Sequence, residues 1–252
     1  MPGRRADVPL TSPLRRRIAL LVTCEHGGNR IPARYAGMFR GYTRLLASHR
    51  GYDPGALATA RTLARTLRAW LVTATVSRLL VELNRSPGRQ FRESPVMRCA
   101  PAALHDEICR RYYEPYWSAV VAFVCAAIAA RRRVVHISSH SFTPRLGGVA
   151  RCADVGLLYD PAHAGERELS LRWQAALRLR APGWTIRRNY PYHGRSDALT
   201  RYLRERFDAR AYTGIELEIN QKHVRNGSAI AAAQREAVAL ALRDALSLAD
   251  SP

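Results

Sequence analysis

Short apolar runs that alternate with stretches of helical periodicity constrain the fold of this chain more than any other feature. The runs IALLVTC (18–24) and VVHIS (134–138) are continuous, which is typical of strands buried on both faces. Residues 54–70 instead repeat their apolar positions at helical spacing, with Asp53 as a candidate N-cap and Pro54 at the first helical position. This alternation predicts an α/β fold in which helices cover both faces of a mixed, mostly parallel sheet.

The same patterns assign an element to most of the chain. Strands are predicted at residues 18–24, 71–76, 79–83, 134–138, 155–159 and 212–220, with a further short strand inside 184–195. Helices are predicted at residues 54–70, 101–130, 166–179, 197–207 and 227–248. The segment 101–130 forms one long helix or two, with a kink expected at Pro115. The polar segment SHSFTPRLGG is expected to form a loop after residue 138.

The length of the chain suits one large domain. A chain of 252 residues can bury a sizeable α/β core, and an apolar fraction of 47% is typical of a folded protein. Residues 1–16 are basic and contain prolines, so we expect a disordered lead-in there. We find no internal repeat or linker in the rest, and we therefore expect residues 17–252 to form a single domain.

The formal net charge of +20 comes almost wholly from arginine, and Lys222 is the one lysine. A basic chain can bind nucleic acid or an anionic membrane. Here the arginines are spread over the whole length, and no basic run alternates with aromatic residues. Nucleic acid is therefore the less favoured partner, although a basic RNA-binding protein stays as a non-enzymatic alternative. A small anionic substrate also suits this charge.

Cysteine usage and the length of the apolar runs bear on the compartment. The five cysteines are an odd number without a CxxC pair, which favours reduced thiols over a disulfide framework. The apolar run at 18–22 is too short for the core of a signal peptide, and the run at 119–130 is too short to span a bilayer. We therefore expect a cytoplasmic protein that does not insert into membranes.

Three predicted strands lead into polar clusters, and these are the places where chemistry is expected. The clusters are CEHGGN (24–29), SSHSF (138–142) and ELEIN (216–220). In sheets of this kind, ligands bind beyond the carboxyl ends of the strands. His26 and His140 each follow an apolar run, and two imidazoles with carboxylates beside a glycine-rich turn suit a zinc site that keeps a position open for water.

Each of these residues also has a structural interpretation. Asp53 could act only as a helix cap, and a single histidine at a strand end is more often a hydrogen-bonded structural group than a ligand. His49, His136 and His223 show no clustering, so structural roles are favoured for them. A thiol enzyme built on Cys24 and His26 is a second catalytic hypothesis, although a buried cysteine at a strand end is the simpler interpretation.

Six segments, in order, resemble those of the N-formylglutamate amidohydrolases. They are CEHGGNRIP, SHRGYDPGA, SRLLVELNRS, SSHSF, NYPYHG and GIELEINQ, and they run from about residue 18 to residue 226. The set is specific, although each segment alone is weak. That family is similar in fold to the zinc carboxypeptidases, so the resemblance implies a three-layer α/β/α sandwich with one catalytic zinc ion per chain.

The resemblance also implies a set of metal ligands. His26 in EHGG is similar to the first zinc ligand of the family, and His140 in SSHS to the last. Carboxypeptidases carry a ligand glutamate three residues after the first histidine, but this chain has Asn29 there. The carboxylate ligand must then come from elsewhere, and we predict Asp53, with Glu25 and His49 as the alternatives.

Further residues are assigned through the same segments. The resemblance implies that Glu218 is the general base, and that Asn84 and Arg85 grip a substrate carboxylate as a similar pair does in carboxypeptidases. Arg78 is expected to stabilise the oxyanion or a substrate carboxylate. The remaining candidates are Arg195, Ser141 and Tyr192 for substrate binding, and Glu216 and Glu25 for support behind the ligands.

These assignments predict a zinc-dependent amidohydrolase that acts on a small, anionic N-acyl amino acid. N-formyl-L-glutamate, cleaved to formate and L-glutamate, is the substrate that the resemblance favours. A related metallo-amidase or carboxypeptidase with another N-acyl amino acid or peptide as its substrate is the alternative.

Overall fold

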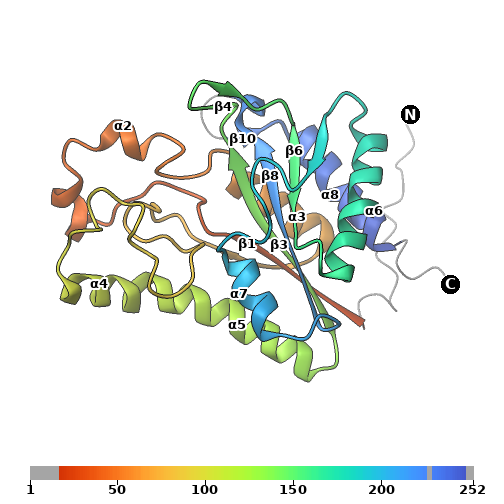
Figure 1. Cartoon of the computed structure of the whole chain (residues 1–252), viewed down its shortest axis with the longest axis horizontal. Coiled ribbons are helices and arrows are strands. Elements are labelled where there is room, and N and C mark those ends of the chain that lie inside the picture. The colour runs from red at the N-terminus through yellow and green to blue at the C-terminus, as the bar shows by residue number, and fades with distance from the viewer. Residues whose placement is uncertain (1–16, 226–228, 248–252) are drawn as a thin grey trace, which may run out of the picture.

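The computed structural model describes residues 17–225 and 229–247, and its centre is a six-stranded sheet (Figure 1). The strand order is β2 (Trp70–Thr73), β1 (Ile18–Cys24), β3 (Arg133–Phe142), β8 (Tyr212–Asn220), β6 (Val155–Leu158) and β7 (Ile186–Arg188). All neighbouring strands are parallel except β6 and β8, which pair antiparallel. The sheet is therefore mixed and mostly parallel, as the sequence predicts. Residues 1–16, where a disordered lead-in is expected, lie outside the described residues.

Helices cover both faces of this sheet. One face packs against α3 (Ala56–Leu67), α6 (Ala164–Arg180) and α8 (Ala232–Ser247), and the other packs against α4 (Ala102–Ile108), α5 (Glu114–Ala129) and α7 (Leu199–Arg206). Figure 1 shows α5 and α7 on one side of the strands and α3, α6 and α8 on the other. The expected three-layer α/β/α arrangement is thus confirmed.

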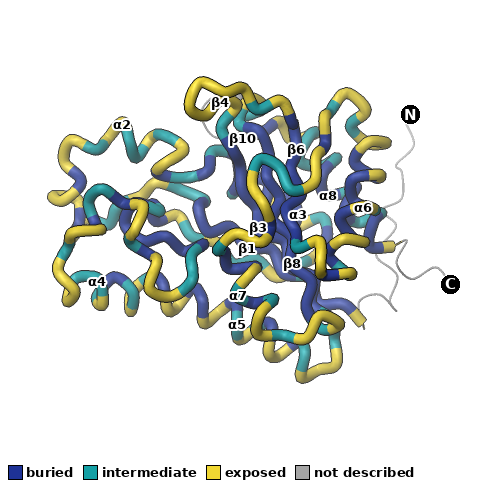
Figure 2. Tube along the Cα trace, viewed as in Figure 1, coloured by how far each residue is buried: buried dark blue, intermediate teal, exposed yellow. Residues whose placement is uncertain are grey.

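The alternation of side chains along β1 connects the two halves of the core. Val22 and Cys24 pack with α3 in one apolar cluster, whereas Ala19 and Leu21 pack in the other with α5. This follows from the period of two in a strand, which sends successive side chains to opposite faces. Nearly every residue of β3 and β8 is buried, so the central strands form the dark core of Figure 2.

The shorter elements lie mostly around the carboxyl edge of the sheet. They are η1 (Ala33–Phe39), α2 (Thr43–Leu46), β4 (Arg145–Leu146), β5 (Val149–Ala150), η3 (Gln221–His223), β9 (Val224–Arg225) and β10 (Ala229–Ile230). A π-helical turn, η2 (Cys109–Tyr113), joins α4 to α5 without a break, so residues 102–129 form a continuous helical segment within the predicted range 101–130, and Pro115 stands in the first turn of α5. Among the described residues, no helix combines the length and apolar composition that a membrane span requires.

The strand predicted at residues 79–83 is wrong. The backbone turns there, because the amides of Leu80 and Val81 both donate to the carbonyl of Ser77. The apolar side chains of this segment are buried in the core all the same. A short apolar run shows that a segment is buried, but its pattern does not distinguish a strand from a buried turn.

Two boundaries near the carboxyl edge also differ from the prediction. Helix α3 begins at Ala56, with Gly55 as its N-cap at a φ of 84°, and the side chain of Asp53 does not cap it. Strand β3 continues through Phe142, because its pairing with β8 extends to Asn220. His140 therefore lies inside a paired strand rather than in the predicted loop, and α8 begins at Ala232 rather than at residue 227.

Candidate active site

The carboxyl ends of β1, β3 and β8 are neighbours in the sheet, and a cavity of about 240 Å³ opens beside them. The acidic residues that line it are Asp53, Asp197, Glu216 and Glu218, the histidines are His26, His49, His140 and His193, and the arginines are Arg78 and Arg85. The three polar clusters predicted from the sequence therefore meet at one place. The parallel pairing of the three strands is what brings them together.

The turn after β1 fixes the position of His26. A Cβ atom on Gly27 would lie 2.7 Å from the carbonyl oxygen of Ala74, and a Cβ atom on Gly28 would lie 2.7 Å from that of Thr75. These distances are shorter than a carbon–oxygen contact allows, so only glycine lets the turn pack against the segment after β2. The His26 carbonyl accepts a hydrogen bond of 2.9 Å from the Asp53 amide, which aligns the two residues.

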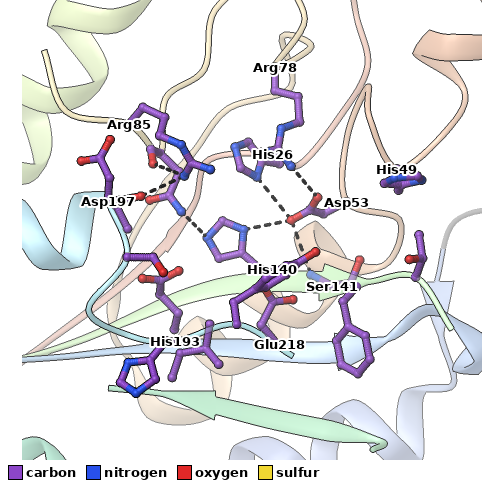
Figure 3. Close-up of a pocket in the computed structure, with 18 residues that line it drawn as sticks. His26, His49, Asp53, Arg78, Arg85, His140, Ser141, His193, Asp197 and Glu218 are labelled. Carbon is purple, nitrogen blue, oxygen red and sulfur yellow. Dashed lines mark hydrogen bonds and ion pairs between the residues drawn. The ribbon is translucent and has the colours of Figure 1, made fainter. Parts of the chain in front are cut away.

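Beside this turn, His140 from β3 and Asp53 from the segment before α3 converge with His26. One oxygen of Asp53, Oδ2, lies 3.3 Å from Nδ1 of His26 and 2.9 Å from Nδ1 of His140 (Figure 3). Each residue offers one ligand atom, all of these atoms lie within 4.8 Å of one another, and all three side chains are buried. Two nitrogens and one oxygen at this spacing match the ligand set of a catalytic zinc site with an open position. The residues present therefore fit the metal that the sequence implies.

The other nitrogen of each ring is held by a second carboxylate. His26 Nε2 pairs with Glu82, and His140 Nε2 lies 3.2 Å from Glu25 Oε2 and 2.8 Å from Ser138 Oγ. Carboxylates behind metal-bound histidines commonly fix the tautomer and orientation of the ring. Glu25 therefore lies behind His140, on the side of the ring away from Asp53, so its position matches a supporting role better than that of a third ligand.

Charge interactions keep these carboxylates ionised despite their burial. Burial raises the pKa of Asp53, but the charges and hydrogen bonds of His26 and His140 outweigh it and hold that pKa well below its usual range. In the same way, His140 overcomes the effect of burial on Glu25 and lowers its pKa to about 2. The cluster thus presents deprotonated oxygens, which a metal cation requires of its carboxylate ligands.

Glu218 differs from the other acidic groups. It stands directly opposite His140 in the pairing of β8 with β3, and its Oε2 atom is buried without a hydrogen-bond partner in the described part of the chain. Burial is the largest influence on this carboxyl, and with the negative charges of Asp53 and Glu216 it raises the pKa to about 8, against the opposing effect of His140. A buried carboxyl with a pKa near neutrality is suited to move a proton.

Two arginines reach the cavity. Arg78 pairs with Glu82 Oε2 at 2.5 Å and lies 3.5 Å from Asp53 Oδ1, with 22% of its side chain exposed. Arg85 donates from Nη1 to the backbone carbonyls of Asn84 and Asp197, at 3.0 and 2.9 Å. Both guanidinium groups are therefore anchored at the cavity wall.

Asn84 connects the arginine wall to the histidine cluster. Its Oδ1 accepts from the amide of Leu199 at 2.9 Å, and its Nδ2 lies 3.3 Å from His140 Nε2. Ser141 also lines the cavity, and its hydroxyl donates to the Pro54 carbonyl at 2.7 Å. Both side chains are thus held in place beside the cluster.

Two residues predicted to bind substrate, Tyr192 in the segment NYPYHG and Arg195 directly after it, lie in different places. Tyr192 lines the cavity, and its hydroxyl accepts from Arg151 at 3.1 Å. Arg195 does not line it; its side chain is 68% exposed and lies 3.8 Å from Asp160 in a neighbouring depression. The structure therefore gives no support to Arg195 as a substrate-binding residue.

Glu82 is the site residue that the sequence interpretation missed. It contacts His26 and Arg78, and its Oε1 also accepts from the Asn84 amide at 2.9 Å. The sequence carried a clue, because a lone acid inside the apolar run LLVEL must be buried and therefore needs partners. Assigning that run to a strand concealed the clue.

The three histidines for which the sequence favours structural roles all lie outside the ligand cluster. His49 lines the cavity apart from the ligand atoms, and burial together with Arg78 and Arg151 lowers its pKa (Figure 3). His136 is enclosed in the sheet, and His223 lies 2.6 Å from Asp154. Neither of the latter two lines the cavity.

The position of Cys24 disfavours thiol chemistry. Its side chain packs in the apolar cluster with α3 and does not line the cavity. Burial and the nearby charges of Glu25 and Asp53 raise the pKa of the thiol well above its usual value. A nucleophilic cysteine needs the opposite shift.

Comparison with known proteins identifies relatives in sequence and in fold. Residues 18–224 match a family model described as N-formylglutamate amidohydrolase. Gene product Atu2144 of Agrobacterium tumefaciens is 27% identical, with a TM-score of 0.73 over 91% of this chain and 90% of that one. The N-formylglutamate amidohydrolase of Ralstonia eutropha JMP134 is 21% identical, with a TM-score of 0.64 over 91% and 93%. A comparison with curated proteins gave no match.

Proposed function

Because the chain belongs to the N-formylglutamate amidohydrolase family, we propose that it is a zinc-dependent amidohydrolase that cleaves the amide of a small N-acyl amino acid. The observation that carries the proposal is the convergence of His26, Asp53 and His140 on one point, with Glu218 beside it. N-formyl-L-glutamate is the reference substrate, since the family is named for it.

In this proposal His26, Asp53 and His140 hold the metal. When bound there, a zinc ion would supply Lewis acidity toward the amide carbonyl and make a water molecule easier to deprotonate. Glu82 and Glu25 hold the outer nitrogens of the two rings, so the ring nitrogens Nδ1 stay directed at the same point as Asp53 Oδ2. These two carboxylates thereby fix the orientation of the two proposed ligand rings.

Glu218 is the proton-transfer group of the proposal. Its carboxyl faces the cavity beside His140 and is not neutralised by an ion pair with an arginine of the described chain. It accepts the proton of the attacking water, and it then donates that proton to the nitrogen of the departing amino acid. A positioned acid–base group of this kind contributes about 10²–10⁴-fold to the rate.

The arginine wall orients the substrate. Arg85, anchored on two carbonyls and adjacent to Asn84, binds the α-carboxylate of the amino acid, for which a planar guanidinium fork is well suited. Arg78 reaches the cavity from its anchor on Glu82, where its positive charge stabilises the negative charge that develops on the amide oxygen.

Metal analysis coupled to an activity panel tests this function. Purified protein is expected to carry about one zinc ion per chain and to hydrolyse at least one N-formyl or N-acetyl amino acid, and a chelator should abolish the activity until zinc is restored. Retention of full activity in the chelator would contradict the proposal and favour thiol chemistry. Strong, steeply salt-dependent binding of generic RNA without hydrolysis would favour the non-enzymatic alternative.

A further inference from the structure

Two acidic side chains of the cavity, Asp197 and Glu216, have no role in the mechanism above, and Asp197 already pairs with Arg89. Glu216 lies two residues before Glu218 on β8, so both side chains project from the same face of the strand into the cavity. It is 7% exposed, and its Oε1 atom accepts a hydrogen bond of 2.7 Å from the hydroxyl of Thr200. Within residues 17–225 and 229–247, no arginine, lysine or histidine forms an ion pair with it.

Burying a carboxylate without a positive partner costs free energy, and most acids of the site have such a partner. Asp53 has two histidines and Arg78, Glu82 has His26 and Arg78, and Asp197 has Arg89 at 3.5 Å. Glu216 has a neutral hydroxyl and stands opposite the apolar Leu158 in the pairing of β8 with β6. Among the described residues, Glu216 and Glu218 thus lack the positive partner that Asp53, Glu82 and Asp197 receive from the protein, and of these two only Glu218 has a role in the proposed proton transfer.

The positive groups of the cavity are already engaged elsewhere. Arg78 is paired with Glu82 and Asp53, and Arg85 is placed beside Asn84 for the α-carboxylate. Arg195, a predicted substrate-binding residue, does not line the cavity. Burial and the neighbouring arginines lower the pKa of His49, which disfavours a positive charge on its ring. Among the described residues that line the cavity, a second substrate carboxylate would thus find no free arginine, and it would lie near the carboxyl group of Glu216.

We propose that Glu216 selects N-acyl amino acids whose side chain carries a positive charge, such as an ammonium or guanidinium group. This inference rests on the proposed function. It replaces N-formyl-L-glutamate with the N-acyl derivative of a basic amino acid as the preferred substrate. The bound cation would supply the missing partner of Glu216 through a charge-assisted hydrogen bond, while Thr200 holds the other oxygen in place. Leu158 and Phe142, which also line the cavity, suit the methylene stem of such a side chain.

Substrate competition on the zinc-loaded enzyme tests the proposal. We expect kcat/KM for N-formyl-L-lysine to exceed that for N-formyl-L-norleucine, its uncharged analogue, by about tenfold or more, and to exceed that for N-formyl-L-glutamate by a larger factor. Glu216→Gln should bring the lysine-to-norleucine ratio close to one, whereas Glu168→Gln, at an exposed position on α6, should leave it unchanged.

A binding measurement separates this proposal from the proposed function. L-Lysine should bind the wild-type enzyme more tightly than L-norleucine in calorimetry, and Glu216→Gln should remove the difference even if the variant turns over slowly. Hydrolysis that favours N-formyl-L-glutamate, or a uniform loss on all substrates in Glu216→Gln, would overturn the selectivity proposal and leave the amidohydrolase intact. Absence of both zinc binding and hydrolysis would instead overturn the function, and with it the inference.

Discussion

Two histidines on strand β3, four residues apart and on the same face, have opposite environments. His136, in the middle of the sheet, bonds to the hydroxyls of Thr23 at 2.8 Å and Tyr212 at 2.7 Å, and burial lowers its pKa to about 4. His140, at the carboxyl edge, meets Asp53 and Glu25, and their hydrogen bonds and charges overcome its burial and raise its pKa well above the usual value. Burial alone therefore does not distinguish a structural histidine from one at a functional site.

The origin of the neighbours explains the difference. Both partners of His136 come from adjacent strands, β1 and β8, whose residues in the sheet interior carry neutral hydroxyls. The two carboxylates that contact His140 come from the segments that follow β1 and precede α3, whereas Glu218 approaches it from the carboxyl end of β8. Strand ends receive loops, and loops can bring charged groups that a packed sheet interior does not tolerate.

The largest contrast is expected from removing each ring. His140→Ala should lose zinc and reduce hydrolysis to background, because one of three proposed ligands is gone. His136→Ala should keep zinc and lose about 1–3 kcal/mol of stability, because the hydroxyls of Thr23 and Tyr212 lose their partner. Zinc content and urea unfolding of both variants measure this. Equal zinc content in the two variants would remove the distinction between the histidines.

Glu218→Gln should have the next largest effect. The variant is expected to keep zinc and the fold but to lose about 10²–10⁴-fold in kcat, because its side chain no longer accepts a proton. Single-turnover hydrolysis and metal analysis of the same preparation measure the two properties together. Loss of zinc in Glu218→Gln would instead show that Glu218 is a metal ligand, and the mechanism would then require another general base.

Glu82→Gln tests whether the carboxylate that pairs with Nε2 of His26 supports metal binding. We expect zinc affinity to fall by about 10–100-fold, as is typical when a carboxylate behind a metal-bound histidine is removed. Competition with a chromogenic chelator measures the affinity. Glu107→Gln is the matched control, because Glu107 pairs with Arg34 and Arg111 at the surface and away from the cavity. An unchanged affinity in Glu82→Gln would mean that Glu82 serves Arg78 alone.

The smallest effect concerns the pH dependence of stability. The pKa of His136 is lower in the folded chain than the ordinary histidine value, so the unfolded chain binds the proton more readily between about pH 4 and 6.5. Its neutral form therefore stabilises the fold above pH 6.5, and this contribution is lost as the pH falls toward 4. His136→Gln should reduce the slope of unfolding free energy against pH in that window by up to about 1.4 kcal/mol per pH unit. An unchanged slope would contradict a buried neutral ring.

The sequence predicts only part of the site at the carboxyl edge of the sheet. Apolar runs that lead into His26 and His140 predict a meeting of polar groups, and the six motif segments predict the family, which the family model confirms. The partner of His26 could not be anticipated, since Glu82 sits in a run that has the composition of a strand and the backbone of a turn. Arg195 shows the converse, because adjacency to a motif did not place it in the cavity.

The close packing of the turn after β1 has a consequence for altering this protein in the laboratory. Any side chain at position 27 or 28 would push against the carbonyls of Ala74 and Thr75 and displace His26 with the turn. Saturation libraries should therefore recover only glycine at these two positions, whatever substrate is used for selection. Positions such as Tyr192, which is half-exposed at the cavity rim, offer room for variation. Redesign of specificity in this scaffold is thus best directed at the rim and at β8, with the glycine turn left untouched.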